Sequence, residues 1–403
     1  MNEVPAFLAD PALRAVLAAL PGARLVGGCV RDALAGREVA DIDLATPWRP
    51  EAVMRALRAA GLKAVPTGLD HGTVTAISHH RGFEVTTLRR DVATDGRRAT
   101  VEYTDDWQED AARRDFTINA MSMTSHGAVF DYFGGRADLA AGRVRFVGDA
   151  ATRIAEDFLR VLRFFRFHAR YGTGDADPAA LAAIRDGVPG LRQLSAERVW
   201  SELKRILAAP DPREATRLMA RLGVLAAVLP EGFALTRFEA LVAAGAPAEP
   251  VLRLAALLDG DAAALAERLR LSKAEGALLA ALRTGEVPAD DADDDAVRRA
   301  LADTPLGVLT GRAWLAGRNA GLRARLAAMP APVFPLHGRD LKAAGMPDGP
   351  AMGALLRDLR GWWLAGGCIG DVRAELRRRL ADTLTPSLSR DAGEGGAERR
   401  VRG

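Results

Sequence analysis

The chain has 403 residues, of which 49% are apolar and 27% are charged. These values are ordinary for globular proteins, so the composition excludes a fibrous or wholly disordered chain. The net charge of +3 neither requires nor excludes a nucleic-acid partner. The sequence shows no long apolar run and no signal-peptide pattern, and two cysteines are too few for a disulfide framework or a cysteine-built zinc site. We therefore expect a cytoplasmic protein.

The first third of the chain alternates between helix and strand patterns, and the rest reads as helices separated by Gly and Pro. The polar, turn-rich segment 89–112 is expected to be a mobile loop. The acidic stretch 289–296 is expected to be a solvated loop or a helix start. The pattern predicts an α+β head followed by an all-α remainder. Strands are expected near 24–26, 41–45, 73–78, 83–88 and 98–103, and helices near 11–20, 29–36, 50–60, 156–170 and 195–209.

The segment 25–46 (LVGGCVRDALAGREVADIDLAT) carries the strongest chemical signal. Gly27 and Gly28 follow a strand, where glycine lets the backbone approach an anion, and Arg31 is placed to reach the same anion. Asp41 and Asp43 lie two apart on a strand, so both carboxylates project from one face and repel unless a cation lies between them. Hard oxygen ligands suit Mg²⁺, and two Mg²⁺ ions with phosphates suit in-line displacement at phosphorus. Each feature alone is more often structural, but their combination in this order favours a functional site.

This arrangement resembles the head of the polymerase-β-type nucleotidyltransferases. More narrowly, it is similar to class II tRNA nucleotidyltransferases (CCA-adding enzymes) and bacterial poly(A) polymerases. The resemblance implies that Asp41 and Asp43 hold two catalytic metal ions. It also implies that Gly27, Gly28 and Arg31 contact a nucleoside triphosphate.

Several neighbouring residues have a structural interpretation. The resemblance implies that Asp32 supports the glycine turn. Cys29 stands where the family commonly has alanine, and we interpret it as a small buried residue. Glu84 shares a strand face with Thr86, and two interpretations stay open: a third metal-facing carboxylate or the partner of an arginine. We also interpret four residues of the segment 130–149 as structural: Asp131, Gly134, Gly135 and Asp138.

The segment 113–121 (RRDFTINAM) is the most specific match to the family. The resemblance implies that Arg114 contacts the nucleotide and that Asp115 and Asn119 brace the ribose and the loop. Two arginines at a helix start are disfavoured by the helix dipole, so an anionic ligand would explain them. The alternative is a set of ion pairs with the acidic residues of 105–110.

The predicted helix 156–170 (EDFLRVLRFFRFHAR) places one acid and a row of arginines along one side. A solvated arginine face is the alternative, but such faces normally mix Arg with Glu and Lys. Asp accepts and Arg donates hydrogen bonds, so together they can recognise the Watson–Crick edge of a base. The resemblance implies that Asp157 and Arg160 pair with CTP or ATP, and that Arg163 and Arg166 hold the helix and the nucleotide. We expect Glu197 and Arg198 to lock the following helix to this one.

From these motifs we expect an Mg²⁺-dependent enzyme that adds CCA to tRNA 3′ ends from CTP and ATP and releases pyrophosphate. It would grip the acceptor and T-arm of tRNA, with no obligate protein partner. A poly(A) polymerase or an A-adding enzyme of the same family is the nearest alternative, and the full-length segment 89–112 argues against a CC-adding enzyme. A D-x-D sugar-nucleotide transferase and an inactive RNA-binding protein are more distant. We expect a head over 1–149, a neck over 150–215, a helical body over 216–330, a tRNA-binding tail over 331–384 and a disordered end over 385–403.

Overall fold

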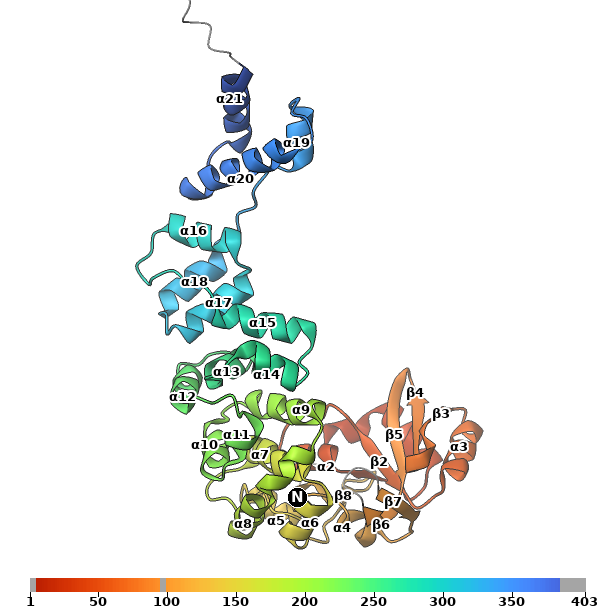
Figure 1. Ribbon diagram of the computed structural model, residues 1–403. Helices are drawn as coiled ribbons and strands as arrows, with labels where there is room; N and C mark the ends of the chain where they lie inside the picture. Colours follow the sequence, from red (N-terminus) through yellow and green to blue (C-terminus); the bar gives the residue numbers. More distant parts are fainter. Residues whose placement is uncertain (1–4, 95–98, 385–403) are drawn as a thin grey trace, which may run out of the picture. The chain divides into compact units, whose positions relative to one another are not determined.

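A computed structural model describes residues 5–94 and 99–384 of the chain. The chain divides into two compact units, Met1–Ala280 and Ala281–Gly403. Figure 1 shows the mixed sheet near the N-terminus, in red to brown, and the succession of helices that follows it along the chain. The sequence prediction of an α+β head followed by helices is confirmed. None of the described helices combines the length and apolar character that a membrane crossing needs. The expected disordered end, 385–403, lies outside the described residues.

The head is built on a seven-stranded mixed sheet with the order β3-β4-β5-β2-β1-β8-β9. Neighbouring strands run antiparallel except β2 and β5, which run parallel. The sequence patterns missed β3, which is an edge strand with a proline inside it, and β8 and β9, which have only two residues each. The strands are β1 (Arg24–Val26), β2 (Asp43–Thr46), β3 (Lys63–Gly68), β4 (Thr73–Ser78), β5 (Arg81–Thr87), β8 (Ser122–Met123) and β9 (Val129–Phe130).

Alternation along the strands gives the sheet two chemically different faces. One face is apolar and carries Leu25, Leu44 and Val85, which form the core of the head with α1 (Pro11–Ala19) and α3 (Pro50–Ala59). The other face carries a cross-strand row in which Asp43 on β2 lies between Val26 on β1 and Glu84 on β5. This second face is where acidic side chains can meet a ligand.

The predicted alternation around the Asp-x-Asp pair is confirmed. Ile42 and Leu44 are buried, whereas Asp41 and Asp43 are exposed. The strand is shorter than predicted, because β2 begins at Asp43 and leaves Asp41 in the preceding loop.

Helices of the first unit cover the sheet and continue beyond it. Phe116 and Phe167 pack ring against ring with centroids 5.2 Å apart, and Phe116 also contacts Phe146 at 4.8 Å. These contacts fix α7 against the segment that follows α4. The remaining helices are α2 (Gly28–Leu34), α4 (Trp107–Ala112), α5 (Gly135–Ala140), α6 (Ala150–Glu156), α7 (Leu159–Tyr171), α8 (Pro178–Gly187), α9 (Ala196–Leu207), α10 (Arg213–Arg221), α11 (Val224–Val228), α12 (Leu235–Ala243), α13 (Pro250–Leu257) and α14 (Ala262–Arg268), with 3₁₀ turns at Ala6–Ala9, Leu69–His71, Thr117–Asn119 and Val188–Gln193.

The prediction of a mobile loop over 89–112 is wrong for the described part of that segment. β6 (Arg89–Thr94) and β7 (Ala99–Tyr103) form an antiparallel hairpin, and α4 follows it. The strand expected near 98–103 is confirmed as β7. Polar composition hid β6 and α4, because β6 is placed by its pairing with β7 and α4 is capped by the Asp106 side chain.

The predicted continuous helix over 156–170 is also wrong, because a break separates α6 from α7. Asp157 has an extended backbone (φ −158°, ψ 107°), and α7 begins only at Leu159. The Asp157 carboxylate accepts a hydrogen bond from the Leu159 N–H at 3.0 Å. Asp is a good capping residue, and here it caps the start of α7 rather than standing on the helix.

The second unit is helical, and its apolar residues gather in two clusters. Val297, Leu309 and Leu326 belong to the first, and Leu341 and Leu359 belong to the second. The acidic stretch 289–296 is a helix start, as expected, because the Asp293 side chain caps α16. The helices are α15 (Lys273–Arg283), which contains the boundary between the units, α16 (Asp294–Asp303), α17 (Leu306–Leu315), α18 (Ala320–Ala328), α19 (Gly338–Ala343), α20 (Pro350–Ala365) and α21 (Val372–Leu384).

Candidate functional site

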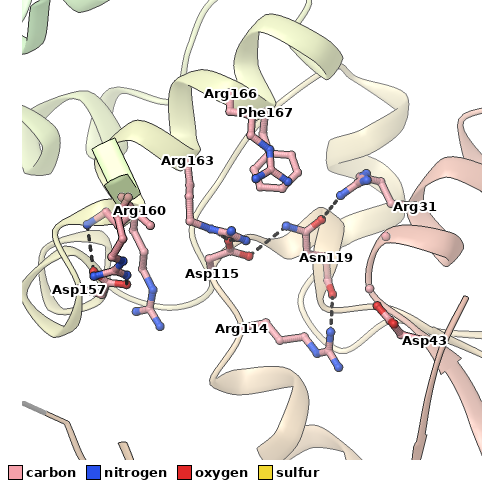
Figure 2. Close-up of a pocket in the computed structure, with 14 residues that line it drawn as sticks. Arg31, Asp43, Arg114, Asp115, Asn119, Asp157, Arg160, Arg163, Arg166 and Phe167 are labelled. Carbon is pink, nitrogen blue, oxygen red and sulfur yellow. Dashed lines mark hydrogen bonds and ion pairs between the residues drawn. The ribbon is translucent and has the colours of Figure 1, made fainter. Parts of the chain in front are cut away.

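A pocket of about 450 Å³ lies in the first unit. Its lining comes from the glycine turn after β1, from β2, from the segment after α4, and from α7 and α9 (Figure 2). Nine of the ten site residues predicted from sequence line this pocket, and Asp41 is the exception. The lining residues are Gly27, Gly28, Arg31, Asp43, Arg114, Asp115, Asn119, Asp157, Leu159, Arg160, Arg163, Arg166, Phe167 and Arg198.

The glycine turn needs glycine for two reasons. Gly27 has a positive φ of 71°, which side chains other than glycine rarely adopt. A Cβ at Gly27 would also lie 3.1 Å from Nη1 of Arg114, inside ordinary contact distance. Behind the turn, the Cys29 thiol donates to the carbonyl of Val26 at 3.3 Å, and burial raises its pKa to about 11. Cys29 is therefore a buried structural residue, as expected.

A chain of polar contacts between residues that line the pocket joins α2 to α7 (Figure 2). Arg31 donates to Asn119 Oδ1 at 2.6 Å, and Asn119 donates to Asp115 at 3.0 Å. Asp115 in turn accepts from Arg163 at 2.7 Å. Burial alone would raise the pKa of Asp115, but the Arg163 charge and these hydrogen bonds outweigh it and lower the pKa. Asp115 is therefore held as a carboxylate that orients Arg163.

Asp32 holds Arg31, the first residue of this series of polar contacts. Its carboxylate accepts from Arg31 at 3.0 Å and also from the Tyr171 hydroxyl. The Tyr171 ring lies 4.5 Å from the Arg31 guanidinium, within cation–π distance. Asp32 thus holds Arg31 in place rather than only supporting the turn.

Arg114 lines the pocket, but the prediction that it stands at the start of a helix is wrong. Arg113 and Arg114 follow the C-terminal end of α4, where the helix dipole favours cations, and do not start a helix. Both pair with the buried Asp110, at 2.9 Å and 3.2 Å respectively. The structural alternative thus holds for these ion pairs, although Arg114 also lines the pocket.

Negative charge concentrates at the edge of the pocket around Asp43. Asp43 is accessible from the pocket, but the surrounding protein displaces part of the water around its carboxylate. This desolvation and the neighbouring Glu84 carboxylate raise the pKa of Asp43, Arg114 offsets part of the rise, and Asp41 adds to it. No described arginine forms an ion pair with Glu84, so the arginine-partner interpretation has no support there. No set of three or more Asp, Glu, His or Cys side chains in the described ranges is arranged to hold a metal ion. Mg²⁺ needs only one or two protein carboxylates when substrate phosphates and water complete its shell, so Asp41 and Asp43 fit it.

Three arginines of α7, namely Arg160, Arg163 and Arg166, are anchored by acidic partners from other elements, whereas Arg170 is exposed. Arg166 pairs with the buried Glu202 of α9 at 3.1 Å, and Arg163 lies 3.9 Å from the same carboxylate. Burial lowers the pKa of Arg166 although Glu202 opposes this. Arg160 pairs with Glu156 and donates to the carbonyl of Arg153 at 2.8 Å. The guanidinium groups are therefore held at set positions around the pocket.

The expected lock between α9 and the start of α7 is half confirmed. Arg198 donates to Asp157 Oδ2 at 2.6 Å, which joins the two elements. Glu197 instead pairs with Arg270, so its predicted role is wrong. Glu197 lies on an exposed position of α9, and its partner Arg270 follows α14.

Two contributors to the site were missed from the sequence. The sequence patterns gave no role to Phe167, yet it lines the pocket. Its ring centroid lies 5.1 Å from the Arg31 guanidinium and 4.8 Å from that of Arg166. Its position next to Arg166 and four residues after Arg163 was the available signal. The role of Glu202 as the partner of Arg166 was also missed, because the pattern of apolar residues in α9 does not show which helix packs against the Glu202 side.

The fold and the pocket define a nucleotidyltransferase of the polymerase type, with a carboxylate pair at the edge of an arginine-lined pocket. The family model for the poly A polymerase head domain matches residues 23–145, and the model described as "Probable RNA and SrmB- binding site of polymerase A" matches residues 176–235. The human mitochondrial CCA tRNA nucleotidyltransferase 1 is 39% identical over 360 residues, which covers 85% of this chain and 83% of the human protein. The chain belongs to the family of class II tRNA nucleotidyltransferases and bacterial poly(A) polymerases.

Further relatives are CCA-adding enzymes. The CCA-adding enzyme of Streptococcus sanguinis is 39% identical over 217 residues, 53% of each chain. The crystal structure of the Bacillus stearothermophilus CCA-adding enzyme in complex with CTP superposes with a TM-score of 0.74 and 28% identity, and covers 93% of this chain and 99% of that one.

Proposed function

We propose that this protein is a CCA-adding enzyme that extends tRNA 3′ ends with CTP and ATP and releases pyrophosphate. The observation that carries the proposal is the pocket itself, in which arginines from four segments (α2, the segment after α4, α7 and α9) converge beside the Asp43 carboxylate. The 39% identity to a CCA tRNA nucleotidyltransferase over most of both chains supports it. In this reaction the RNA 3′ hydroxyl attacks the α-phosphorus of the nucleotide.

The triphosphate is bound by the glycine turn and its arginines in this proposal. Gly27 and Gly28 let the backbone approach the phosphates, and Arg31 and Arg114 supply charge-assisted hydrogen bonds. Both guanidinium groups are pre-oriented, Arg31 by Asn119 and Asp32 and Arg114 by Asp110. Less ordering is therefore needed when the nucleotide binds.

The base is selected by Asp157 and Arg160 in this proposal. Their hydrogen-bonding groups offer the acceptor and donors that an unpaired base edge needs. Asp157 is held by Arg198 and by its own capping bond to α7, which sets the direction of its carboxylate. Arg163 and Arg166 line the same pocket, so we assign them to the incoming nucleotide.

Asp41 and Asp43 are the residues that would hold Mg²⁺. When bound, the metal would polarise phosphate oxygens and lower the pKa of the attacking hydroxyl. The donor set fits, because two neighbouring carboxylates that repel each other, with a raised Asp43 pKa, are stabilised by a divalent cation. The role of Glu84 as a third metal-facing group stays a prediction.

We further propose that the helices after residue 149, divided into neck, body and tail as predicted, hold the acceptor and T-arm of tRNA. Such contacts act through phosphates and shape, so binding of tRNA should weaken as salt rises. The cytoplasm remains the predicted compartment.

The direct test uses purified protein, Mg²⁺, labelled CTP and ATP, and a tRNA transcript that lacks CCA. We expect CCA at the 3′ end of the product and no labelling from GTP or UTP. An unstructured RNA serves as the second acceptor. Long A tails on both RNAs would instead identify a poly(A) polymerase, and transfer from a nucleotide sugar would identify the D-x-D sugar-nucleotide transferase.

A further inference from the structure

A cluster of one arginine and three aromatic side chains lies on the head outside the pocket. We name Arg24, Trp107, Phe130 and Tyr132 the aromatic platform. The Arg24 guanidinium lies 4.1 Å from the centroid of Trp107 and 3.7 Å from that of Phe130, and it donates to the Tyr132 hydroxyl at 3.5 Å. Strand β1, helix α4, strand β9 and the segment after β9 each contribute one residue.

The platform is open to solvent and its cation is unpaired. Phe130 and Tyr132 are each 37% exposed, so part of each ring is accessible to a ligand. Among the described residues, no carboxylate lies within ion-pair distance of Arg24, whereas most arginines of the pocket have one. The platform therefore offers ring surface and an unneutralised positive charge together.

Core packing explains only one member of the platform. Trp107 packs on Val26, Ala45 and Leu88, so it would be retained as a cover for that side of the sheet. Val129, the neighbour of Phe130 on the strand, packs against the core of the head, whereas the Phe130 ring contacts the Arg24 guanidinium. Phe130 therefore helps to hold Arg24 in place and still keeps ring surface open to a ligand.

The platform shares a sheet face with the acidic residues of the candidate active site. The strand register places Phe130 beside Ser122, Ser122 beside Val26, and Val26 beside Asp43. Residues paired across neighbouring strands project from the same face, and neighbouring strands lie about 4.8 Å apart. Three such steps place Phe130 roughly 14 Å along the sheet from Asp43.

We propose that the aromatic platform binds the single-stranded 3′ end of an RNA, with bases stacked on Phe130 and Tyr132 and a phosphate paired with Arg24. Aromatic rings recognise any base face, and an arginine pairs with the backbone, which is the chemistry of single-stranded RNA sites. The distance to Asp43 allows the terminal nucleotide to reach the carboxylates while preceding nucleotides contact the platform. The proposal rests on the proposed function, because it takes the RNA to be the acceptor of the transfer.

The test compares two RNAs and three protein variants in the full chain. One transcript ends in CC, and the other is cut back to the last base pair of the acceptor stem. The double variant Phe130→Leu/Tyr132→Leu removes both rings but keeps apolar side chains, whereas Tyr132→Phe keeps the ring as a matched control. Arg24→Gln removes the charge. Dissociation constants are measured by fluorescence anisotropy, with the melting temperature and the KM for CTP as controls.

We expect the double variant to bind the CC-ended transcript about a hundredfold more weakly, because two base–aromatic stacks of roughly tenfold each are lost, and to bind the cut-back transcript as the wild type does. Arg24→Gln should weaken the CC-ended complex and Tyr132→Phe should not. Unchanged affinity of the double variant for the CC-ended transcript would overturn the proposal, as would an equal loss with both transcripts. A wild type that binds both RNAs but incorporates no nucleotide would contradict the proposed function and leave this comparison intact.

Discussion

Glu202 on α9 is the carboxylate that holds the α7 arginines, and neutralising it should destabilise the first unit. Its side chain is only 3% exposed, and it accepts from Arg166 at 3.1 Å and from Arg205 at 3.2 Å. Glu202→Gln keeps the size of the side chain and removes the charge. It therefore tests the ion pair without opening a cavity.

The expected loss follows from which partner is buried. Arg205 is 56% exposed, so its pair with Glu202 contributes little, whereas Arg166 is 23% exposed. A hydrogen bond to a charged group contributes about 1.5–3 kcal/mol, and the glutamine retains one acceptor oxygen. We therefore expect the free energy of unfolding to fall by about 2 kcal/mol. Because the neutral glutamine holds Arg166 less firmly than the carboxylate does, selection between CTP and ATP should also weaken.

Urea unfolding of both proteins measures this change, and steady-state incorporation of CTP and ATP measures selectivity. Glu214→Gln is the matched control, because Glu214 is 59% exposed and pairs with arginines at the surface, where we expect at most about 0.5 kcal/mol. Equal unfolding free energies for Glu202→Gln and the wild type would refute the reasoning that this buried carboxylate anchors α7.

Asp43→Ala should abolish nucleotide incorporation while tRNA binding in a filter assay stays within about twofold, and removal of Mg²⁺ with a chelator should give the same pattern. Asp157→Ala or Arg160→Ala should blur the choice between CTP and ATP, and unchanged selectivity would count against these two residues as the base-reading pair. Glu275, whose hydrogen bonds outweigh its burial and lower its pKa to about 2 from 4.5, should stabilise the fold above pH 4.5 and lose that contribution as the pH falls toward 2. The urea midpoints of unfolding of Glu275→Gln and the wild type should therefore differ above pH 4.5 and converge as the pH falls from 4.5 toward 2.

Local features of the site could be predicted from the sequence because they depend on neighbouring residues. The glycine turn and the alternation around Asp43 are set by backbone conformation within a few residues, and both are found as predicted. The helix break at Asp157 was missed although it is also local. The Asp157 side chain accepts a hydrogen bond from the Leu159 N–H, but the sequence is equally compatible with Asp157 inside a continuous helix, on the same face as the arginines.

The partners of the site residues could not be predicted, because they come from distant parts of the chain. Asp115 meets Arg163 across 48 residues, and Arg166 meets Glu202 across 36. Helix and strand periodicity relates residues only a few positions apart, so no sequence pattern indicates contacts across 48 or 36 residues. The same holds for the edge strand β9, whose two residues carry no alternation and are placed only by pairing with β8.

The most direct test of the central proposal is incorporation of labelled CTP and ATP into three tRNA transcripts, ending before CCA, after C and after CC. We expect C, C and A on the first, C and A on the second, A alone on the third, and no extension beyond A. Incorporation of A only on the CC-ended transcript would identify an A-adding enzyme. No incorporation into any transcript with Mg²⁺ present would contradict the proposed function.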